Sequence, residues 1–191
     1  MVSNKGQMSA PFELMVAMII MGFVIVVGYN LMASMQCNIC QNDLDKAVTV
    51  FKSGLEKAVN NSTVEKFSFK YDGCFKESLA SARIVKYVDN LKACERACGE
   101  ARSTCFVLIF NASDSSCSPY VSKCLNIPDL TSFVSESTEC EKDESLQDYG
   151  VVSTLVSTDL KKNNLLMGQY VIKTVSSSSS FTPKICVYYK R

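Results

Sequence analysis

The sequence predicts an α+β protein in which a long N-terminal helix, transmembrane and then amphipathic, packs on a disulfide-rich domain built from an antiparallel β-sheet. Three observations predict this fold. Residues 14–36 contain no charged side chain, apolar residues recur at helical spacing beyond them, and all ten cysteines follow that uncharged run. From residue 65 onward the apolar residues alternate or form short runs, which is typical of strands.

The uncharged run is long enough to cross a membrane. A helix over its 23 residues rises about 34 Å at about 1.5 Å per residue, and the hydrocarbon core is about 30 Å thick. We therefore expect residues 7–36 to be retained as a transmembrane helix, because a removable secretory signal has a shorter apolar run and a small-residue cleavage site. Lys5 is the only charged residue before Glu13 and favours a cytoplasmic N-terminus. The chain is thus expected to be a single-pass protein of the cell membrane.

Residues 37–64 are predicted to continue the helix with one apolar face. The apolar positions follow one another in steps of four, three, four and three: Leu44, Val48, Phe51, Leu55 and Ala58. One helix is therefore predicted from about Pro11 to Val59, and its second half is expected to bury this face against the sheet. Four charged residues on the same stretch are expected to face water: Asp43, Lys46, Lys52 and Glu56.

Residues 65–191 are expected to form an extracytoplasmic, β-rich domain. Six segments rich in β-branched and aromatic residues are predicted as strands of one antiparallel sheet: 67–71, 82–88, 104–111, 151–156, 169–175 and 185–189. Between the second and third of them, a short helix is predicted to turn Cys94 and Cys98 toward the sheet. Residues 113–147 are expected to be loop, and the serine run 176–180 a hairpin loop or a disordered insert.

The cysteines are expected to form disulfides in an oxidising compartment, because their number is even and they all follow the membrane segment. They are Cys37, Cys40, Cys74, Cys94, Cys98, Cys105, Cys117, Cys124, Cys140 and Cys186. A zinc site is not expected, since Cys37 and Cys40 form the one Cys-x-x-Cys pair and the chain has no histidine. The same pair has the spacing of a thiol-exchange site, but such sites begin helices, whereas this pair lies inside one.

Composition argues against several classes of function. Without histidine, the chain lacks the common general base and the Ser-His and Cys-His nucleophile pairs. It has no glycine-rich phosphate loop, and its 20 basic and 19 acidic residues leave no excess of positive charge for nucleic acid. We therefore expect no enzyme activity, cofactor, metal or nucleic-acid partner. Asn60, Asn61 and Asn111 stand in Asn-x-Ser/Thr motifs and are potential glycan acceptors.

The residues before the apolar run carry a further signal. The tripeptide Lys5-Gly6-Gln7 stands directly before a short stretch with one glutamate and then the apolar run. This pattern resembles the class III signal peptide of archaeal type IV pilin-like proteins. The resemblance implies that a prepilin-type peptidase removes residues 1–6 as a leader, cutting after Gly6 and leaving Gln7 as the N-terminus of a retained helix.

Three nearby positions bear on the same resemblance, which covers about residues 5–36. Ser9 agrees with the family's pattern, whereas Pro11 stands where the family usually has glutamate, and the acidic residue comes at Glu13. The carboxylate of Glu13 has two interpretations. It lies at the level of the lipid headgroups, or it enters a helix bundle and pairs with the N-terminal amine of a neighbouring subunit, because an unpaired charge in hydrocarbon is costly.

Two functions agree with these observations. The resemblance implies a pilin or minor pilin-like subunit of an extracellular surface filament, assembled with itself or with other pilin-like subunits through the N-terminal helix. The alternative is a single-pass, signal-anchored surface protein that presents a disulfide-rich binding module and never polymerises. Both functions need the same membrane helix, so the sequence alone leaves both open.

Overall fold

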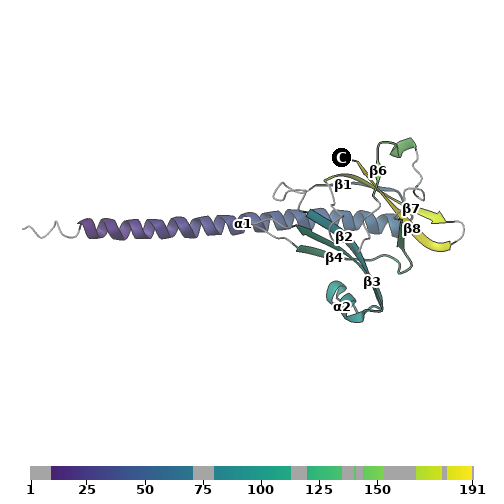
Figure 1. Cartoon of the computed structure of the whole chain (residues 1–191), viewed down its shortest axis with the longest axis horizontal. Coiled ribbons are helices and arrows are strands. Elements are labelled where there is room, and N and C mark those ends of the chain that lie inside the picture. Colours follow the sequence, from purple (N-terminus) through teal and green to yellow (C-terminus); the bar gives the residue numbers. More distant parts are fainter. Residues whose placement is uncertain are drawn as a thin grey trace, which may run out of the picture. The chain divides into compact units, whose positions relative to one another are not determined.

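The computed structural model describes residues 10–70, 80–112, 120–134, 140, 144–152, 167–177 and 180–190 (Figure 1). The chain divides into two units, residues 1–39 and residues 40–191, and the division falls inside the first helix. That helix, α1, runs from Ala10 to Asn60 without interruption, one residue beyond the predicted end on each side. Pro11 lies in its first turn, where a missing N–H breaks no hydrogen bond of the helix.

The second unit contains a small antiparallel sheet of β2 (Ala80–Val88), β3 (Thr104–Ala112) and β4 (Tyr120–Leu125), with β3 in the centre. Helix α2 (Leu91–Cys98) connects β2 to β3. The side chain of Asn90 accepts a hydrogen bond from the N–H of Ala93 and so caps the start of α2. Gly99, with a φ of 72°, ends the helix in the left-handed conformation that glycine adopts without strain.

A larger sheet in the same unit has the strand order β1-β7-β8-β5, and β6 also pairs with β8. The strands are β1 (Glu65–Phe69), β5 (Ser132–Phe133), β6 (Gly150–Val151), β7 (Gly168–Ser177) and β8 (Ser180–Lys190). Strands β7 and β8 form a long antiparallel hairpin across the serine run. The pairing of β5 with β8 is parallel, and the other pairings are antiparallel.

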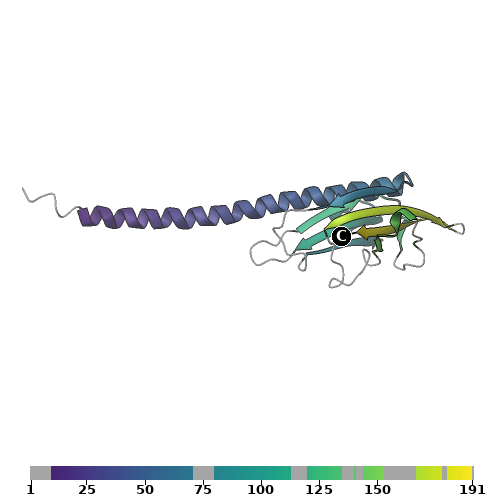
Figure 2. The same ribbon diagram turned by 90° about the horizontal axis from the view of Figure 1, so that it is seen from above.

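The main core of the second unit forms around residues 40–60 of α1, which lie along the strands in Figures 1 and 2. The predicted apolar face is buried. All five of its side chains have exposed fractions of 0–1%: Leu44, Val48, Phe51, Leu55 and Ala58. They pack with Phe106 and Phe110 from the small sheet and with Tyr170 and Ile172 from the large one. Helix α1 therefore supplies the core that both sheets share.

Phe51 is the centre of an aromatic cluster in this core. Its ring lies edge-on to Phe67, with 5.2 Å between centroids, and to Tyr170, with 5.5 Å between centroids. One helical turn away, Gly54 lets the backbone of α1 approach β1 closely, because a Cβ at this position would lie 2.5 Å from Cδ1 of Phe67. The cluster thus fixes β1 and β7 against the helix.

Three disulfides join elements within the described part of the second unit. Two of them attach α2 to the small sheet, Cys94–Cys105 to β3 and Cys98–Cys124 to β4, as the expected orientation of both α2 cysteines requires. The third, Cys140–Cys186, joins the segment before β6 to β8 and lies in a smaller apolar cluster with Leu146 and Tyr188. A separate cluster beneath α2 contains Cys94, Cys105, Val107 and Ile109.

Four expectations from the sequence need correction. The described strands form two sheets, not one, and the large sheet includes a parallel pairing. The region expected to be loop, 113–147, contains β4, β5 and a short 3-10 helix at Glu144–Leu146. The strand expected at 151–156 appears as the two residues of β6, and residues 153–156 lie outside the described part of the chain.

The fourth correction concerns the charged residues of α1. Lys46 is exposed as expected, but Asp43, Lys52 and Glu56 are partly buried. The side chain of Glu56 is only 21% exposed because it contacts the segment that follows β4. The helical periodicity predicted that the side chain of Glu56 would face solvent, because it carries no information on contacts outside the helix.

Candidate functional site: the N-terminal helix

The first half of α1 presents apolar side chains on all sides. Every residue from Pro11 to Gln36 is exposed within this chain. Among the described residues, α1 is the one helix long and apolar enough to cross a bilayer, and its length and composition suit a membrane anchor or a signal sequence. Soluble monomers rarely expose apolar patches larger than a few hundred Å². This half of the helix therefore requires lipid or other protein around it.

Glu13 is the acidic residue in the first turn of α1. A carboxylate there is favoured by the backbone N–H groups that have no partner at a helix N-terminus. The other residues of the predicted processing site, Lys5, Gly6, Gln7 and Ser9, lie outside the described residues. The structure thus places Glu13 at the helix start and leaves the cleavage site and its relation to Glu13 as predictions.

Cys37 and Cys40 lie one turn apart near the boundary between the two units. Both are disulfide-bonded, and the described part of the chain has no free cysteine. Neither sulfur is therefore a thiol in this structure, although the pair has the spacing of a thiol-exchange site. Cys74 and Cys117 lie outside the described residues, whereas the other six cysteines form the three disulfides given above.

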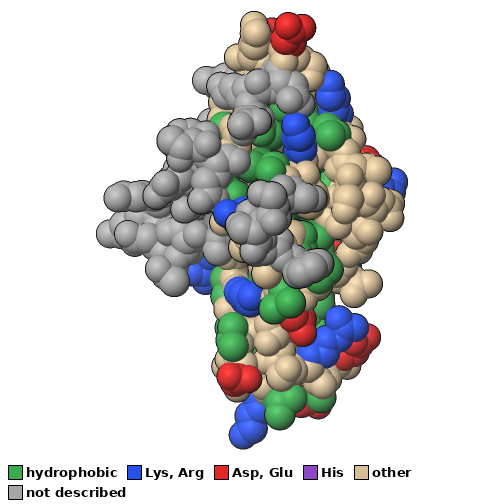
Figure 3. All heavy atoms as spheres, turned by 90° about the vertical axis from the view of Figure 1, so that its right-hand side faces the viewer, with side chains coloured by type: hydrophobic (Ala, Val, Ile, Leu, Met, Phe, Trp, Pro, Cys, Tyr) green, Lys and Arg blue, Asp and Glu red, His purple; other side chains and the backbone are tan. Residues whose placement is uncertain are grey.

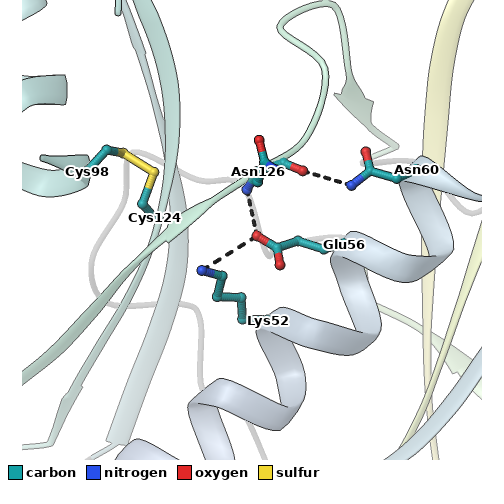
Figure 4. Close-up of polar contacts among 6 residues, drawn as sticks. All are labelled: Lys52, Glu56, Asn60, Cys98, Cys124 and Asn126. Atoms are coloured by element: carbon teal, nitrogen blue, oxygen red, sulfur yellow. Dashed lines mark hydrogen bonds and ion pairs between the residues drawn. A yellow bond between two sulfur atoms is a disulfide. The ribbon is translucent and has the colours of Figure 1, made fainter. Parts of the chain in front are cut away.

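Two side chains at the end of α1 form hydrogen bonds with the backbone of Asn126, the residue that follows β4 (Figure 4). Oε1 of Glu56 accepts a hydrogen bond from the N–H of Asn126 at 2.6 Å, and Nδ2 of Asn60 donates one to its carbonyl oxygen at 2.9 Å. Lys52 lies 3.6 Å from the same carboxylate oxygen. The N–H and the carbonyl oxygen of Asn126 thus both have hydrogen-bond partners, supplied by two side chains one helical turn apart.

Further polar contacts attach the second half of α1 to both sheets. Asp45 pairs with Lys123 of β4 at 2.7 Å, and the hydroxyl of Thr174 in β7 donates to the carbonyl oxygen of Ala58 at 2.9 Å. Because apolar packing is nondirectional and hydrogen bonds are not, these contacts fix the rotation of the helix about its axis. Sequence patterns did not indicate Asn126, Lys123 or Thr174, since each contact joins positions distant along the chain.

The described surface offers little that points to small-molecule chemistry. No group of three or more cysteine, aspartate or glutamate residues that could hold a metal occurs among the described residues. Figure 3 views one end of the molecule, and on the described part of that face acidic, basic and apolar side chains are interspersed.

An exposed ion pair with shifted pKa values joins Asp148 to Lys190 of β8, with 2.9 Å between Nζ and Oδ2. The pair lowers the pKa of Asp148 and raises that of Lys190, chiefly through their hydrogen bond.

Comparison with models of protein families, with curated proteins and with solved structures finds no match. Among the described residues, two features bear most directly on function. One is the apolar, wholly exposed first half of α1, and the other is the set of contacts that build its second half into the domain.

Proposed function

We propose that this protein is a pilin or minor pilin-like subunit of a surface filament, inserted in the membrane by residues 7–36 and assembled through them. The observation that carries the proposal is the continuity of α1. A single helix is exposed and apolar in its first half, and in its second half it forms the core of a disulfide-bonded domain. The apolar half and the domain are thus joined by helix, without an intervening loop.

The physical reason for assembly lies in what surrounds the apolar half. A helix that exchanges lipid for lipid gains nothing by leaving the bilayer, whereas one that packs on copies of itself replaces acyl contacts with interlocked side chains. In that bundle Glu13 needs a cation. Cleavage after Gly6 supplies one, because it creates an ammonium group at Gln7. The proposed order of events is insertion, cleavage and extraction of the helix into a bundle.

The buried face of residues 40–60 supports the proposal in a second way. Phe51 and Leu55 are core residues of the domain, so the domain and this part of the helix fold as one body. Extraction of the apolar half from the membrane therefore carries a folded domain with it. A subunit built this way does not need the domain to rearrange during assembly.

The alternative function, a surface anchor that never polymerises, uses the same helix and is separated by experiment. Gly6→Leu blocks the predicted cleavage, and Ser3→Leu is its matched control, a leucine placed in the leader away from the cleavage motif. Cells producing each variant are examined for the size of the membrane-bound protein and, by electron microscopy, for filaments. We expect Gly6→Leu to leave a full-length precursor and no filaments, and Ser3→Leu to behave as the unaltered protein does.

Glu13→Ala tests the second step. It should allow cleavage after Gly6 and yet reduce the number and length of filaments, because the buried ammonium loses its partner. Phe12→Leu, at the neighbouring exposed position, is the control that changes shape and keeps the charge. Normal surface display and filaments from uncleaved Gly6→Leu would overturn the proposed mechanism. If the unaltered protein is displayed as a monomer and forms no filaments, the anchor function is established.

A further inference from the structure

Two overlapping glycan-acceptor motifs stand at the end of α1. Asn60-Asn61-Ser62 and Asn61-Ser62-Thr63 each have the Asn-x-Ser/Thr pattern, and a third motif begins at Asn111. All three lie in the second unit, which follows the apolar half of α1. Transfer of a glycan to asparagine takes place at Nδ2 of the side chain, so the surroundings of that atom distinguish the three positions.

The Nδ2 atom of Asn60 is engaged in the structure. It donates to the carbonyl oxygen of Asn126 at 2.9 Å, and Figure 4 shows the amide directed from the helix end toward that residue. Glu56, one turn earlier in α1, accepts a hydrogen bond from the N–H of the same residue at 2.6 Å. A sugar on Nδ2 of Asn60 would therefore lie directly beside the backbone of Asn126, which this atom already contacts.

Asn61 differs from Asn60 in its contacts, although both residues are exposed. Asn61 lies in the turn that follows α1, and its backbone N–H donates to the carbonyl oxygen of Lys57 at 3.0 Å. Its side-chain amide makes no hydrogen bond within the described part of the chain. Ser62, with a φ of 53°, turns the chain here, and the exposed Thr63 follows. The asparagine and the threonine of this motif therefore both lie at the surface of a turn.

Asn111 differs from Asn61 in its backbone. It belongs to β3, the central strand of the small sheet, and its register partners are Ser81 in β2 and Tyr120 in β4. A transferase must bind the acceptor motif as an extended or turned segment apart from its neighbours. The pairing of β3 on both sides opposes that, whereas the turn at Asn61 allows it.

We infer that Asn61 is the N-glycosylation site of this protein, with a lipid-phosphate-linked oligosaccharide as donor. Nδ2 of Asn61 forms a bond to C1 of the first sugar, and the bond between C1 and the phosphate oxygen breaks. The phosphate leaves with the electron pair, and the proton of Nδ2 passes to a base of the transferase. The inference requires the domain to be outside the cytoplasm and does not depend on filament formation, so it stands equally for a pilin and for an anchor.

The overlap of the two motifs allows a sharp test. Asn61→Gln and Thr63→Ala each destroy the Asn61 motif and keep the one at Asn60. Ser62→Gly does the reverse and suits the positive φ at this position. Thr63→Ser keeps both motifs and is the conservative control. The full-length protein is purified from the membranes of its own cells, and trypsin releases residues 58–66, which contain both asparagines, for mass spectrometry.

The inference expects a glycan mass on peptide 58–66 in the unaltered protein, in Ser62→Gly and in Thr63→Ser, and its loss in Asn61→Gln and Thr63→Ala. Unmodified peptide from the unaltered protein would overturn the inference. Loss in Ser62→Gly with retention in Asn61→Gln would overturn it in favour of Asn60, and a glycan found only on the peptide containing Asn111 would also contradict it.

Discussion

Glu56 in α1 accepts a hydrogen bond from the backbone N–H of Asn126 at 2.6 Å, across 70 positions of sequence. This contact fastens the end of the helix to the small sheet, because Asn126 directly follows β4. Two residues earlier, Cys124 bonds to Cys98 and fastens the same strand to α2. The segment from Cys124 to Asn126 therefore joins α1 and α2 through one short stretch of backbone, as Figure 4 shows.

The Glu56 contact gives the first prediction. Glu56→Ala should lower the free energy of unfolding by about 1–2 kcal/mol, because the N–H of Asn126 loses a charged acceptor whose side chain is only 21% exposed. Lys52→Ala should cost less than about 0.5 kcal/mol, since its ion pair is longer and more exposed. Urea unfolding of the detergent-solubilised chain, followed by circular dichroism, measures both, and hydrogen exchange at Asn126 reports the bond directly. Equal losses of unfolding free energy in the two variants would show that the Glu56 hydrogen bond does not attach α1 to the segment after β4.

The aromatic cluster gives the second prediction. Phe51→Ala should destabilise the second unit by about 3–5 kcal/mol, since the side chain is 0% exposed and its loss leaves a cavity against Phe67 and Tyr170. Val50→Ala is the matched control on the adjacent, 47% exposed position and should change stability by no more than about 0.5 kcal/mol. A small effect of Phe51→Ala in the same urea assay would mean that α1 is a free stalk.

The third prediction concerns the disulfides. Replacing Cys140 and Cys186 together by alanine should cost about 4 kcal/mol in the chain-entropy view, because the bond closes a loop with a sequence separation of 46. The pair Cys94 and Cys105, with a separation of 11, should cost about 3 kcal/mol. Thermal unfolding of the two double variants provides the comparison. A negligible loss in both would indicate that apolar packing alone maintains the second unit.

The fourth prediction is a pH dependence. The lowered pKa of Asp148 makes the ion pair with Lys190 stabilising above the ordinary aspartate value of about 3.9 and lost as pH falls through the folded-state pKa. The raised pKa of Lys190 makes the pair stabilising below the ordinary lysine value of about 10.4 and lost as pH rises through its own folded-state pKa. NMR titration of the Asp148 carboxyl should show the pKa returning toward normal in Lys190→Met. Lys66→Met is the control, and a normal pKa in the unaltered protein would refute the pairing.

Much of α1 could be predicted because its signals are local. The absence of charge over residues 14–36 and the regular spacing from Leu44 to Ala58 are properties of neighbouring turns, and the structure confirms both the continuous helix and the buried face. The orientation of Cys94 and Cys98 was predictable for the same reason. Their spacing places both on one face of α2, and both bond to the sheet.

The features that were missed depend on contacts between distant residues. Strand β4 escaped prediction because Lys123 interrupts its alternating pattern between the buried Val121 and Leu125, and the reason appears only in the pairing of Lys123 with Asp45. Glu56 was assigned to water because nothing in its own helix indicates Asn126. The division into two sheets depends on strand pairings, such as β1 with β7, that strand composition does not encode.

The processing site remains a prediction, because residues 1–9 lie outside the described part of the chain. The proposed function depends on one covalent event there, the removal of residues 1–6 with retention of α1. It separates the pilin from a signal-anchored protein, which keeps its original N-terminus, and from a secreted protein, which loses the apolar run.

The most direct measurement is the N-terminal residue of the mature protein, determined by mass spectrometry of its N-terminal peptide after purification from the membrane or from surface filaments. The proposed pilin function predicts that the chain begins at Gln7 and contains the whole of residues 7–36. A chain that begins at Met1 or Val2, or at a residue beyond the apolar run, would contradict it.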